Sequence, residues 1–392
     1  MSNKTINAIS NTVGRELRRM VSRPIYFIGT VLVMGITYLF FMTFFSEGQP
    51  NKMPIAVVDL DQSSTSRHLI HNLDATQQVK IVMHLSSHKE AREEMQKGNI
   101  YAFLEIKKDF SKEVFANRRP AITFYVNDGY LIAGSLILKD LTYMSMATSI
   151  SVQQKVLRAK GVEENRIMGI LQPIVADTHL IGNPWANYGT YLLNVIIPAI
   201  FSLAILIMTV FPIGVEFKER TSRAWLINAD SSMFAALTGK LLPYTLIFTT
   251  IGLIGNMLLY KFMHYPLSSS IWWMFLATFM LVIASQCVGV LFIGAMPVLR
   301  DGITLSSLFG TLGVTFAGAT FPIEQMPYGV RILSYLFPIR HYFNIYVNQA
   351  LTGAGINHSV LSFVSLAAFW ILPFFVYYRI KIFAINQNIP TK

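Results

Sequence analysis

Long apolar stretches without charged residues recur along this chain of 392 residues. Each holds close to the ~20 apolar residues that a helix needs to cross a bilayer. The pattern predicts six membrane-spanning helices, at residues 24–45, 188–213, 241–260, 271–296, 303–321 and 359–378. Prolines then interrupt residues 322–340, after the fifth span. Since proline removes a backbone donor, we expect a re-entrant segment there rather than a continued helix.

Residues 47–187 follow a different pattern, in which short strand-like and helical stretches alternate. Strands are predicted at 54–61, 79–85, 100–106 and 121–128, and helices at 63–73, 88–98, 130–160 and 163–171. This alternation is typical of a soluble α/β domain. The sequence therefore indicates a polytopic α-helical membrane protein with six transmembrane helices, an inserted extracytoplasmic α/β domain, and a re-entrant segment after the fifth helix.

The first 23 residues have an amphipathic helical pattern. Apolar residues recur at spacings of three and four, with arginines between them: Ile6, Ile9, Val13, Leu17 and Met20, with Arg15, Arg18 and Arg19. Such a basic amphipathic helix is expected to lie flat on the inner leaflet and to contact membrane lipids. The alternative is a plain cytoplasmic extension that only supplies positive charge.

The composition, 53% hydrophobic and 14% charged, is too apolar for an ordinary soluble protein. Segments 1–23, 214–240, 300–301 and 379–392 together hold thirteen Lys and Arg against five Asp and Glu, whereas residues 47–187 hold sixteen against fifteen. This asymmetry follows the positive-inside rule. It predicts cytoplasmic termini, a cytoplasmic segment 214–234 and a periplasmic domain 47–187, and it explains the net charge of +11 without nucleic acid.

Catalytic, metal-binding and cofactor-binding patterns are missing from the sequence. Cys287 is its single cysteine, so neither a disulfide nor a cysteine metal site is expected. Asp59, Asp61 and Ser63 follow a strand, where turn and helix-cap chemistry is more common than an acid pair or a metal site. His68 and His71 share a face of the predicted helix, but no third ligand stands at a motif spacing. No G-x-x-x-x-G-K-[ST] sequence occurs, so we expect no phosphate-binding loop of that kind.

Several stretches resemble the ABC type-2 transporter permeases, in the subgroup with a large periplasmic domain between the first two spans. The glycine-rich fifth span followed by FPIEQMP and LSYLFPIRHY is similar to the last-but-one helix and re-entrant segment of these permeases. GRELRRMVSRP looks like their opening segment, and IAVVDLDQSSTSR and LIGNPWANY resemble parts of their external domain. The resemblance implies a separate cytoplasmic ABC ATPase subunit as a partner.

The stretch EFKERTSRAWL is similar to the coupling helix of this family, which docks in the ATPase. Glu219, Arg220 and Thr221 match an E-R-G-T-type sequence, although Ser222 follows and the family glycine is absent. The residues that the resemblance assigns to ATPase coupling are Glu216, Glu219, Arg220, Thr221 and Trp225. We expect Glu219, Arg220 and Trp225 to engage the ATPase. The alternative is an ordinary charged loop between two spans.

The fifth span and its following loop suggest a pathway or gate. Its candidate residues are Gly310, Gly313, Phe316, Phe321, Pro322 and Ile323. Small residues permit close approach of helices, and apolar side chains can form a constriction that excludes water. We expect a second copy of the chain, or a close paralogue, to face this surface. The alternative is that these residues pack inside one subunit.

The function implied is that of a permease subunit of an ATP-driven ABC exporter. Its substrate would be a drug-like molecule, a lipid or an envelope component, and a periplasmic adaptor protein is a further candidate partner. ATP hydrolysis would take place on the separate subunit, and no cofactor is expected on this chain. The alternative is a membrane receptor or scaffold whose periplasmic domain binds a ligand and which transports nothing.

Overall fold

The computed structural model describes residues 3–116, 118 and 120–387. The chain divides into two compact units. The helical unit comprises residues up to Gly48 together with those from His179 onward, and the α/β unit comprises Gln49–Thr178. The second unit is an insertion, because the chain leaves the helical unit after one long apolar helix and returns to it before the next.

The helical unit contains helices α1 (Asn3–Ser22), α2 (Pro24–Phe27), α3 (Val33–Phe44), α9 (Tyr188–Lys218), α10 (Ser222–Asn228), α11 (Met233–Met257), α12 (Ile271–Ala295), α13 (Leu299–Phe316), α14 (Tyr328–Ser334), α15 (Pro338–Tyr346), α16 (Val360–Ala368) and α17 (Leu372–Asn386). A π-helical turn, Ile28–Leu32, joins α2 to α3. Similar turns extend α11 through Leu258–Phe262 and α15 through Val347–Leu351. Short 3-10 turns lie at Ile323–Gln325, Ile356–His358 and Phe369–Ile371.

Five helices within the described residues are long and apolar enough to cross a membrane. They are Pro24–Phe44, Tyr188–Lys218, Met233–Phe262, Ile271–Ala295 and Val360–Asn386. The chain is therefore a polytopic helical membrane protein. The expected fifth span corresponds to α13, which has 18 residues and ends at Phe316. The charged residues Arg300 and Asp301 in its first turn, together with its glycine, serine and threonine residues, lower its mean hydropathy, so a count of six spans stays a prediction.

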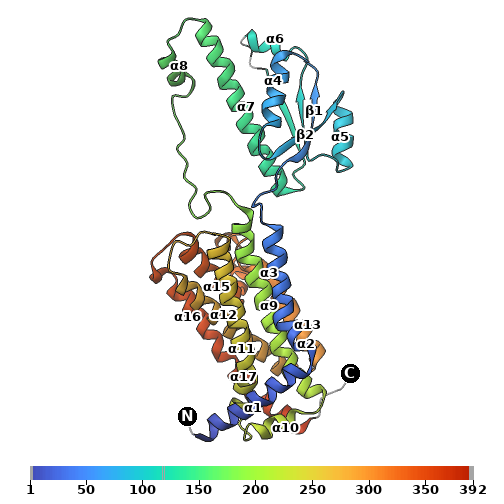
Figure 1. Ribbon diagram of the computed structural model, residues 1–392, viewed down its shortest axis with the longest axis vertical. Helices are drawn as coiled ribbons and strands as arrows, with labels where there is room; N and C mark the ends of the chain where they lie inside the picture. The colour runs from blue at the N-terminus through green and yellow to red at the C-terminus, as the bar shows by residue number, and fades with distance from the viewer. Residues whose placement is uncertain (1–2, 117, 119, 388–392) are drawn as a thin grey trace. The chain divides into compact units, whose positions relative to one another are not determined.

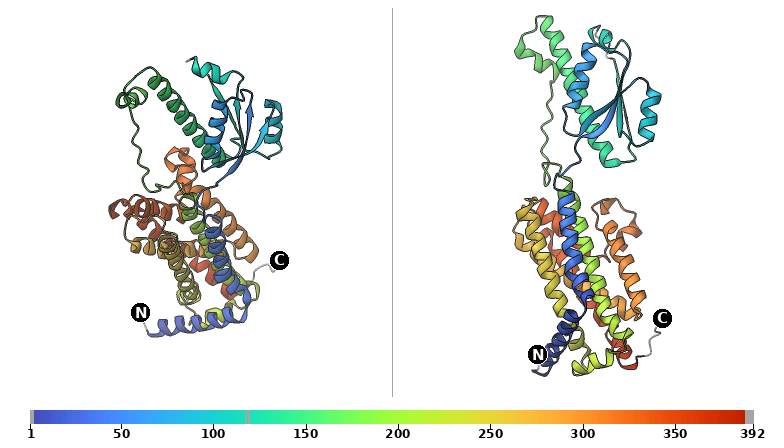
Figure 2. Two further views of the ribbon diagram at one scale, coloured as in Figure 1. Left: turned by 45° about the horizontal axis from the view of Figure 1, so that its top comes forward. Right: turned by 45° about the vertical axis from the view of Figure 1, so that its right-hand side comes forward.

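Helix α9 lies at the centre of the helical unit and packs against α3, α12 and α13. Its side chains are buried along nearly its whole length, including Leu193, Ile197, Phe201, Ile205 and Val210. Helix α1 lies across one end of this bundle, and α10 and the C-terminal end of α17 lie at the same end (Figures 1 and 2). Helices α1 and α10 and the end of α17 therefore lie together at one end of the long helices.

The α/β unit contains a four-stranded sheet in the order β2-β1-β3-β4. Its strands and helices are β1 (Met53–Asp59), α4 (Ser64–Asp74), β2 (Val79–Leu85), α5 (His88–Gln96), β3 (Ala102–Ile106), α6 (Phe110–Phe115), β4 (Ile122–Val126), α7 (Leu131–Ala159) and α8 (Glu164–Leu171). Strand β1 runs parallel to β2 and β3, and β4 is antiparallel to β3. Helices α4 and α7 cover one face and α5 the other (Figure 1).

The strands and long helices predicted for this unit are confirmed. Helix α6 was not predicted, since its six residues are too few for a periodic pattern. Asp59 performs turn chemistry, because its carboxylate accepts hydrogen bonds from the backbone of Asp61 and Gln62 and from Ser66 Oγ. Ser63 caps α4 by accepting from the Ser66 backbone N–H at 3.0 Å. Within the described residues, no group of three metal-ligating side chains occurs.

Candidate functional site

The candidate site lies where α1 crosses the ends of α9 and α11. Helix α1 buries Ala8, Thr12 and Glu16, which follow one another at four-residue intervals on one face. This face reaches the α11 backbone because Gly239 has no side chain. A Cβ at that position would lie 2.7 Å from the Cβ of Thr12. Small residues thus bring the carboxylate of Glu16 into the interior of the unit.

Two glutamates and one lysine meet there in the protein interior. Lys240 Nζ on α11 donates to Glu16 Oε2 at 2.5 Å and to Glu216 Oε1 at 2.9 Å. The Tyr244 hydroxyl donates to the other oxygen of Glu16 at 2.7 Å. The side chains of Lys240 and Glu216 are fully buried, and that of Glu16 is 1% exposed. Buried charges persist only when they are paired, so α1, α9 and α11 are locked together here.

Arginines of α1 complete the pairing. Arg15 donates to both oxygens of Glu216, at 2.6 and 3.0 Å, and Arg19 donates to the same carboxylate at 2.5 Å. Arg19 also bonds Glu219, which accepts two further hydrogen bonds from Arg23. We call Arg15, Glu16, Arg19, Glu216 and Lys240 the buried ion cluster. Glu219 and Arg23 lie at its exposed margin, where the hydrogen bonds from Arg23 lower the pKa of the Glu219 carboxyl.

Helix α10 forms the corner between α9 and α11 and is tied to both. The Thr221 hydroxyl donates to Glu216, and the indole N–H of Trp225 donates to the carbonyl oxygen of Ala236 at 3.2 Å. Trp225 is fully buried, with Lys240 Nζ 5.2 Å from its ring centroid. Ser222 donates to the carbonyl of Ala384 on α17. A force on α10 would therefore be passed directly to three long helices.

The opposite face of α10 does not pack against other helices of the unit. Arg220, Arg223, Ile227 and Asn228 are exposed, and Ile227 is 65% exposed. A basic surface with one exposed aliphatic side chain suits a protein contact. The sequence-based role for Trp225 is accordingly revised. Because its ring is buried, it cannot touch a partner directly and can act only by holding α10 in place.

The sequence pattern indicates Glu216 and Thr221, but it does not indicate Lys240, which donates to Glu216, or Glu16 and Tyr244, which bond each other. Two signals were available. Glu16 occurs at the four-residue interval set by Ala8 and Thr12, and Lys240 stands at the edge of an otherwise charge-free span. Neither signal identifies a partner far along the chain. In α1, Ile6 and Leu17 are about half exposed, pointing away from the helical unit, which fits an interfacial helix.

The glycines of the predicted gate face neighbours within the same chain. A Cβ at Gly310 would meet the side chain of Leu203 on α9, and one at Gly313 would lie 3.2 Å from Ile339 on α15. These two residues therefore follow the alternative in which they pack inside one subunit. The exposed side of α13 is carried instead by Thr304, Leu308, Thr311, Leu312 and Thr315.

The other predicted gate residues lie in different environments: an aromatic stack, a cavity and the exposed surface. Phe316 stacks on Phe337 with centroids 4.7 Å apart, and Phe337 stacks on Phe309 at 4.4 Å. Pro322 and the buried Ile323 line a cavity of about 510 Å³ beside α15 and α16. Phe321 is 52% exposed. The loop therefore packs against α13 through an aromatic stack that the sequence did not reveal, because Phe309 and Phe337 are 28 positions apart.

These features define a multi-pass helical membrane protein. Its short helix α10 joins the ends of α9 and α11, and buried ion pairs hold α1 against the same ends. The family model described as "ABC-2 family transporter protein" matches residues 22–378. The chain therefore belongs to the ABC-2 transporter family. This match covers the apolar helices and the inserted α/β unit together.

A curated relative supports the same assignment. The chain is 25% identical over 351 residues to ABC transporter G family member 20 of Dictyostelium discoideum. The alignment covers 87% of this chain and 46% of that protein. The chain thus spans just under half the length of this relative.

Proposed function

We propose that this chain is the permease subunit of an ATP-driven exporter, and that a separate cytoplasmic ABC ATPase docks on the exposed face of α10. The observation that supports the proposal is the buried corner at Trp225. It joins an exposed surface to α9, α11 and α17 without a flexible link. Family membership supports a role in transport.

The coupling route begins at Arg220, Arg223 and Ile227 and continues through Thr221 to Glu216. From Glu216 the buried ion cluster carries the displacement to α1 and α11. Closure of two ATPase subunits would shift α10, and α9 would move with it because α9 carries Glu216, whose carboxylate accepts a hydrogen bond from Thr221. The helices would move as rigid bodies, so this movement requires no catalytic residue on this chain.

The proposal includes a bacterial inner-membrane location, cytoplasmic termini and a periplasmic α/β unit. It also includes six spans, with α13 as the fifth, and a pathway shared with a second copy or a paralogue. The positive-inside distribution supports the orientation. The exposed hydroxyl-bearing face of α13 supports the shared pathway, because Thr304, Thr311 and Thr315 would otherwise face lipid. The substrate would be a drug-like molecule, a lipid or an envelope component.

The second candidate function is that of a receptor or scaffold, which the separately folded α/β unit favours. Reconstitution with the partner ATPase distinguishes the two. For the permease, substitution of Ile227 by Glu should abolish ATPase binding and transport, while the matched substitution Leu60→Glu, at an exposed aliphatic residue of the α/β unit, should spare ATPase binding. Full transport by the Ile227→Glu variant would contradict the proposed docking face.

A further inference from the structure

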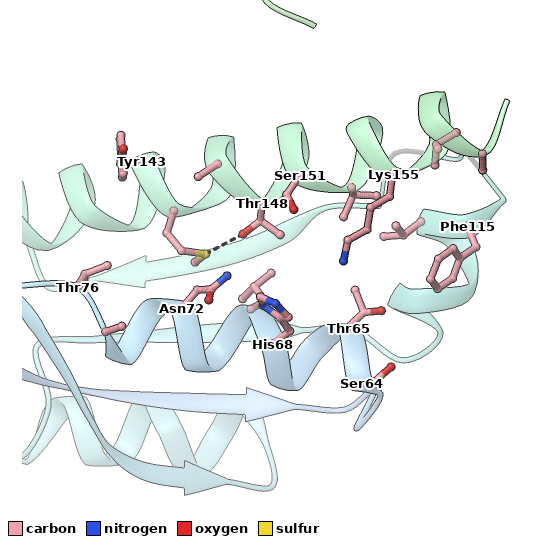
Figure 3. Close-up of a pocket in the computed structure, with 18 residues that line it drawn as sticks. Ser64, Thr65, His68, Asn72, Thr76, Phe115, Tyr143, Thr148, Ser151 and Lys155 are labelled. Atoms are coloured by element: carbon pink, nitrogen blue, oxygen red, sulfur yellow. Dashed lines mark hydrogen bonds between the residues drawn. The ribbon is translucent and has the colours of Figure 1, made fainter. Parts of the chain in front are cut away.

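A groove of about 660 Å³ lies within the α/β unit, between α4 and α7. Its walls include Leu69 and Asn72 of α4 and Met144, Ser151 and Val152 of α7. Figure 3 shows these two helices side by side, with polar side chains extending into the space between them. The volume falls in the range of about 300–1,000 Å³ that is typical of small-molecule sites.

The groove exists because α7 continues beyond its last contact with the core. Gly134, Leu136, Ile137, Leu141 and Met144 are its buried residues, and the helix then runs on to Ala159. Over this second half, the small residues Ala147 and Ser151 line the groove. Small side chains leave the space open. An extended helix with no buried residue over its second half gains little from packing, so an occupant would stabilise it.

Two of the side chains that line the groove can carry a positive charge. Lys155 and His68 line it from opposite helices, and Figure 3 shows both side chains extending into the space. Neither has an ion-pair or hydrogen-bond partner among the described residues. Of the described residues that line the groove, none is Asp or Glu. Ser64 and Thr65, in the first turn of α4, also line the groove, and the Thr65 hydroxyl lies 3.2 Å from the Ser111 hydroxyl.

The remaining lining is largely apolar. Leu69, Val114, Met144, Val152 and Val156 supply aliphatic or thioether surface. Apolar walls with a few convergent donors select a molecule that is itself apolar with one polar group. Because the unpaired basic side chain is a lysine, an anionic group gains both charge and hydrogen bonds there.

We infer that this groove binds an anionic amphiphile, an acyl chain with a carboxylate or phosphate head. The head lies between Lys155 and His68, and the acyl chain lies against Leu69, Met144 and Val152. The groove is lined only by residues of the α/β unit, so this inference goes beyond the permease role and does not rest on it. Lys155 sets the preference for an anion, and the small side chain of Ala147 keeps the groove open.

The test uses the full chain in lipid nanodiscs and photoreactive probes with the same long acyl chain. One probe is a fatty acid, one a lysophosphatidate and one the neutral fatty alcohol. After illumination, mass spectrometry locates the labelled peptides. Labelling of α4 and α7 by an anionic probe, well above that by the alcohol, is expected. Which anionic probe labels more strongly identifies the head group.

Variants make the result specific. Lys155→Ala should lower anionic labelling of α4 and α7 at least about fivefold, as expected for a lost charge-assisted hydrogen bond. Lys139→Ala, on the same helix outside the groove, should leave it unchanged. Ala147→Trp should lower labelling by every probe, because it fills the space. The inference is overturned if label is confined to the membrane helices, if the alcohol labels the groove equally, or if Lys155→Ala changes nothing.

Discussion

Lys240 on α11 and Glu16 on α1 form an ion pair of 2.5 Å between two side chains that are both buried. They are separated by 224 positions in the sequence, and their meeting fixes α1 against the end of a long apolar helix. Glu216 bonds the same ammonium from α9. The N-terminal helix is therefore an integral part of the corner formed by α9, α10 and α11.

Removing the lysine should destabilise the protein strongly. Lys240→Met leaves Glu16 and Glu216 buried without their shared cation, which costs about 3–5 kcal/mol for a broken buried pair. Thermal unfolding of the purified protein would measure the loss. Lys218→Met is the matched control, because Lys218 is exposed nearby. Equal stability of the two variants would show that the pair is not formed in the membrane.

The margin of the cluster should respond to acid. The hydrogen bonds from Arg23 depress the pKa of Glu219, so its stabilisation is present at neutral pH and is lost as pH falls through the depressed value. Glu219→Gln should lower the stability at pH 7 by less than about 1 kcal/mol, because the pair is partly exposed. The difference from the unmodified protein should shrink below about pH 4. A difference that stays constant with pH would contradict the pairing.

The α/β unit was largely predictable because its information is local. Short, nearly continuous apolar runs in β1 and β3 mark strands that are buried on both faces, and the Ser63 hydroxyl marks the start of α4. In contrast, the roles of Glu16 and Lys240 depend on a contact between distant segments, which neither periodicity nor hydropathy records. The direction in which Trp225 points was also set by packing, since an indole side chain suits an interface as well as a core.

The sequence did not indicate which face of α13 contacts a second copy of the chain. Glycines at 310 and 313 signal close approach, but they do not say to which neighbour. The structure assigns them to Leu203 and Ile339. The C-terminal end of α13 was predicted at residue 321 instead of Phe316 because Ala317 and Ala319 continue the apolar pattern, although Gly318 has a φ of +92° and does not continue the helix.

Membrane orientation can be tested by labelling. In a Cys287→Ser background, cysteine at Ser231 should be protected from an impermeant maleimide in intact cells, and cysteine at Gly98 should react. The expectation rests on the excess of basic residues near α10 and the balance of charge in the α/β unit. Disrupted cells provide the control, since both positions should then react. Reaction at Ser231 in intact cells would reverse the orientation.

The surface of α13 that meets a second copy should be the exposed one. In the same background, Leu312→Cys should form a cross-link between subunits in a functional complex, because Leu312 is 50% exposed. Gly313→Cys should not, because that position packs against Ile339. Gel mobility under oxidising conditions reads the result. A cross-link at 313 in the absence of one at 312 would restore the glycine face as the contact between copies.

Site-specific photocross-linking can show whether an ATPase docks on the exposed face of α10. A photoreactive amino acid replaces Ile227, and the same amino acid replaces Trp272, which is 71% exposed at the first turn of α12. The products are then probed with photoreactive ATP. If α10 is the docking face, the photoreactive residue at position 227 should cross-link to a polypeptide that carries the ATP label, and the one at position 272 should not. An ATP-labelled product at neither position, or equally at both, would contradict it.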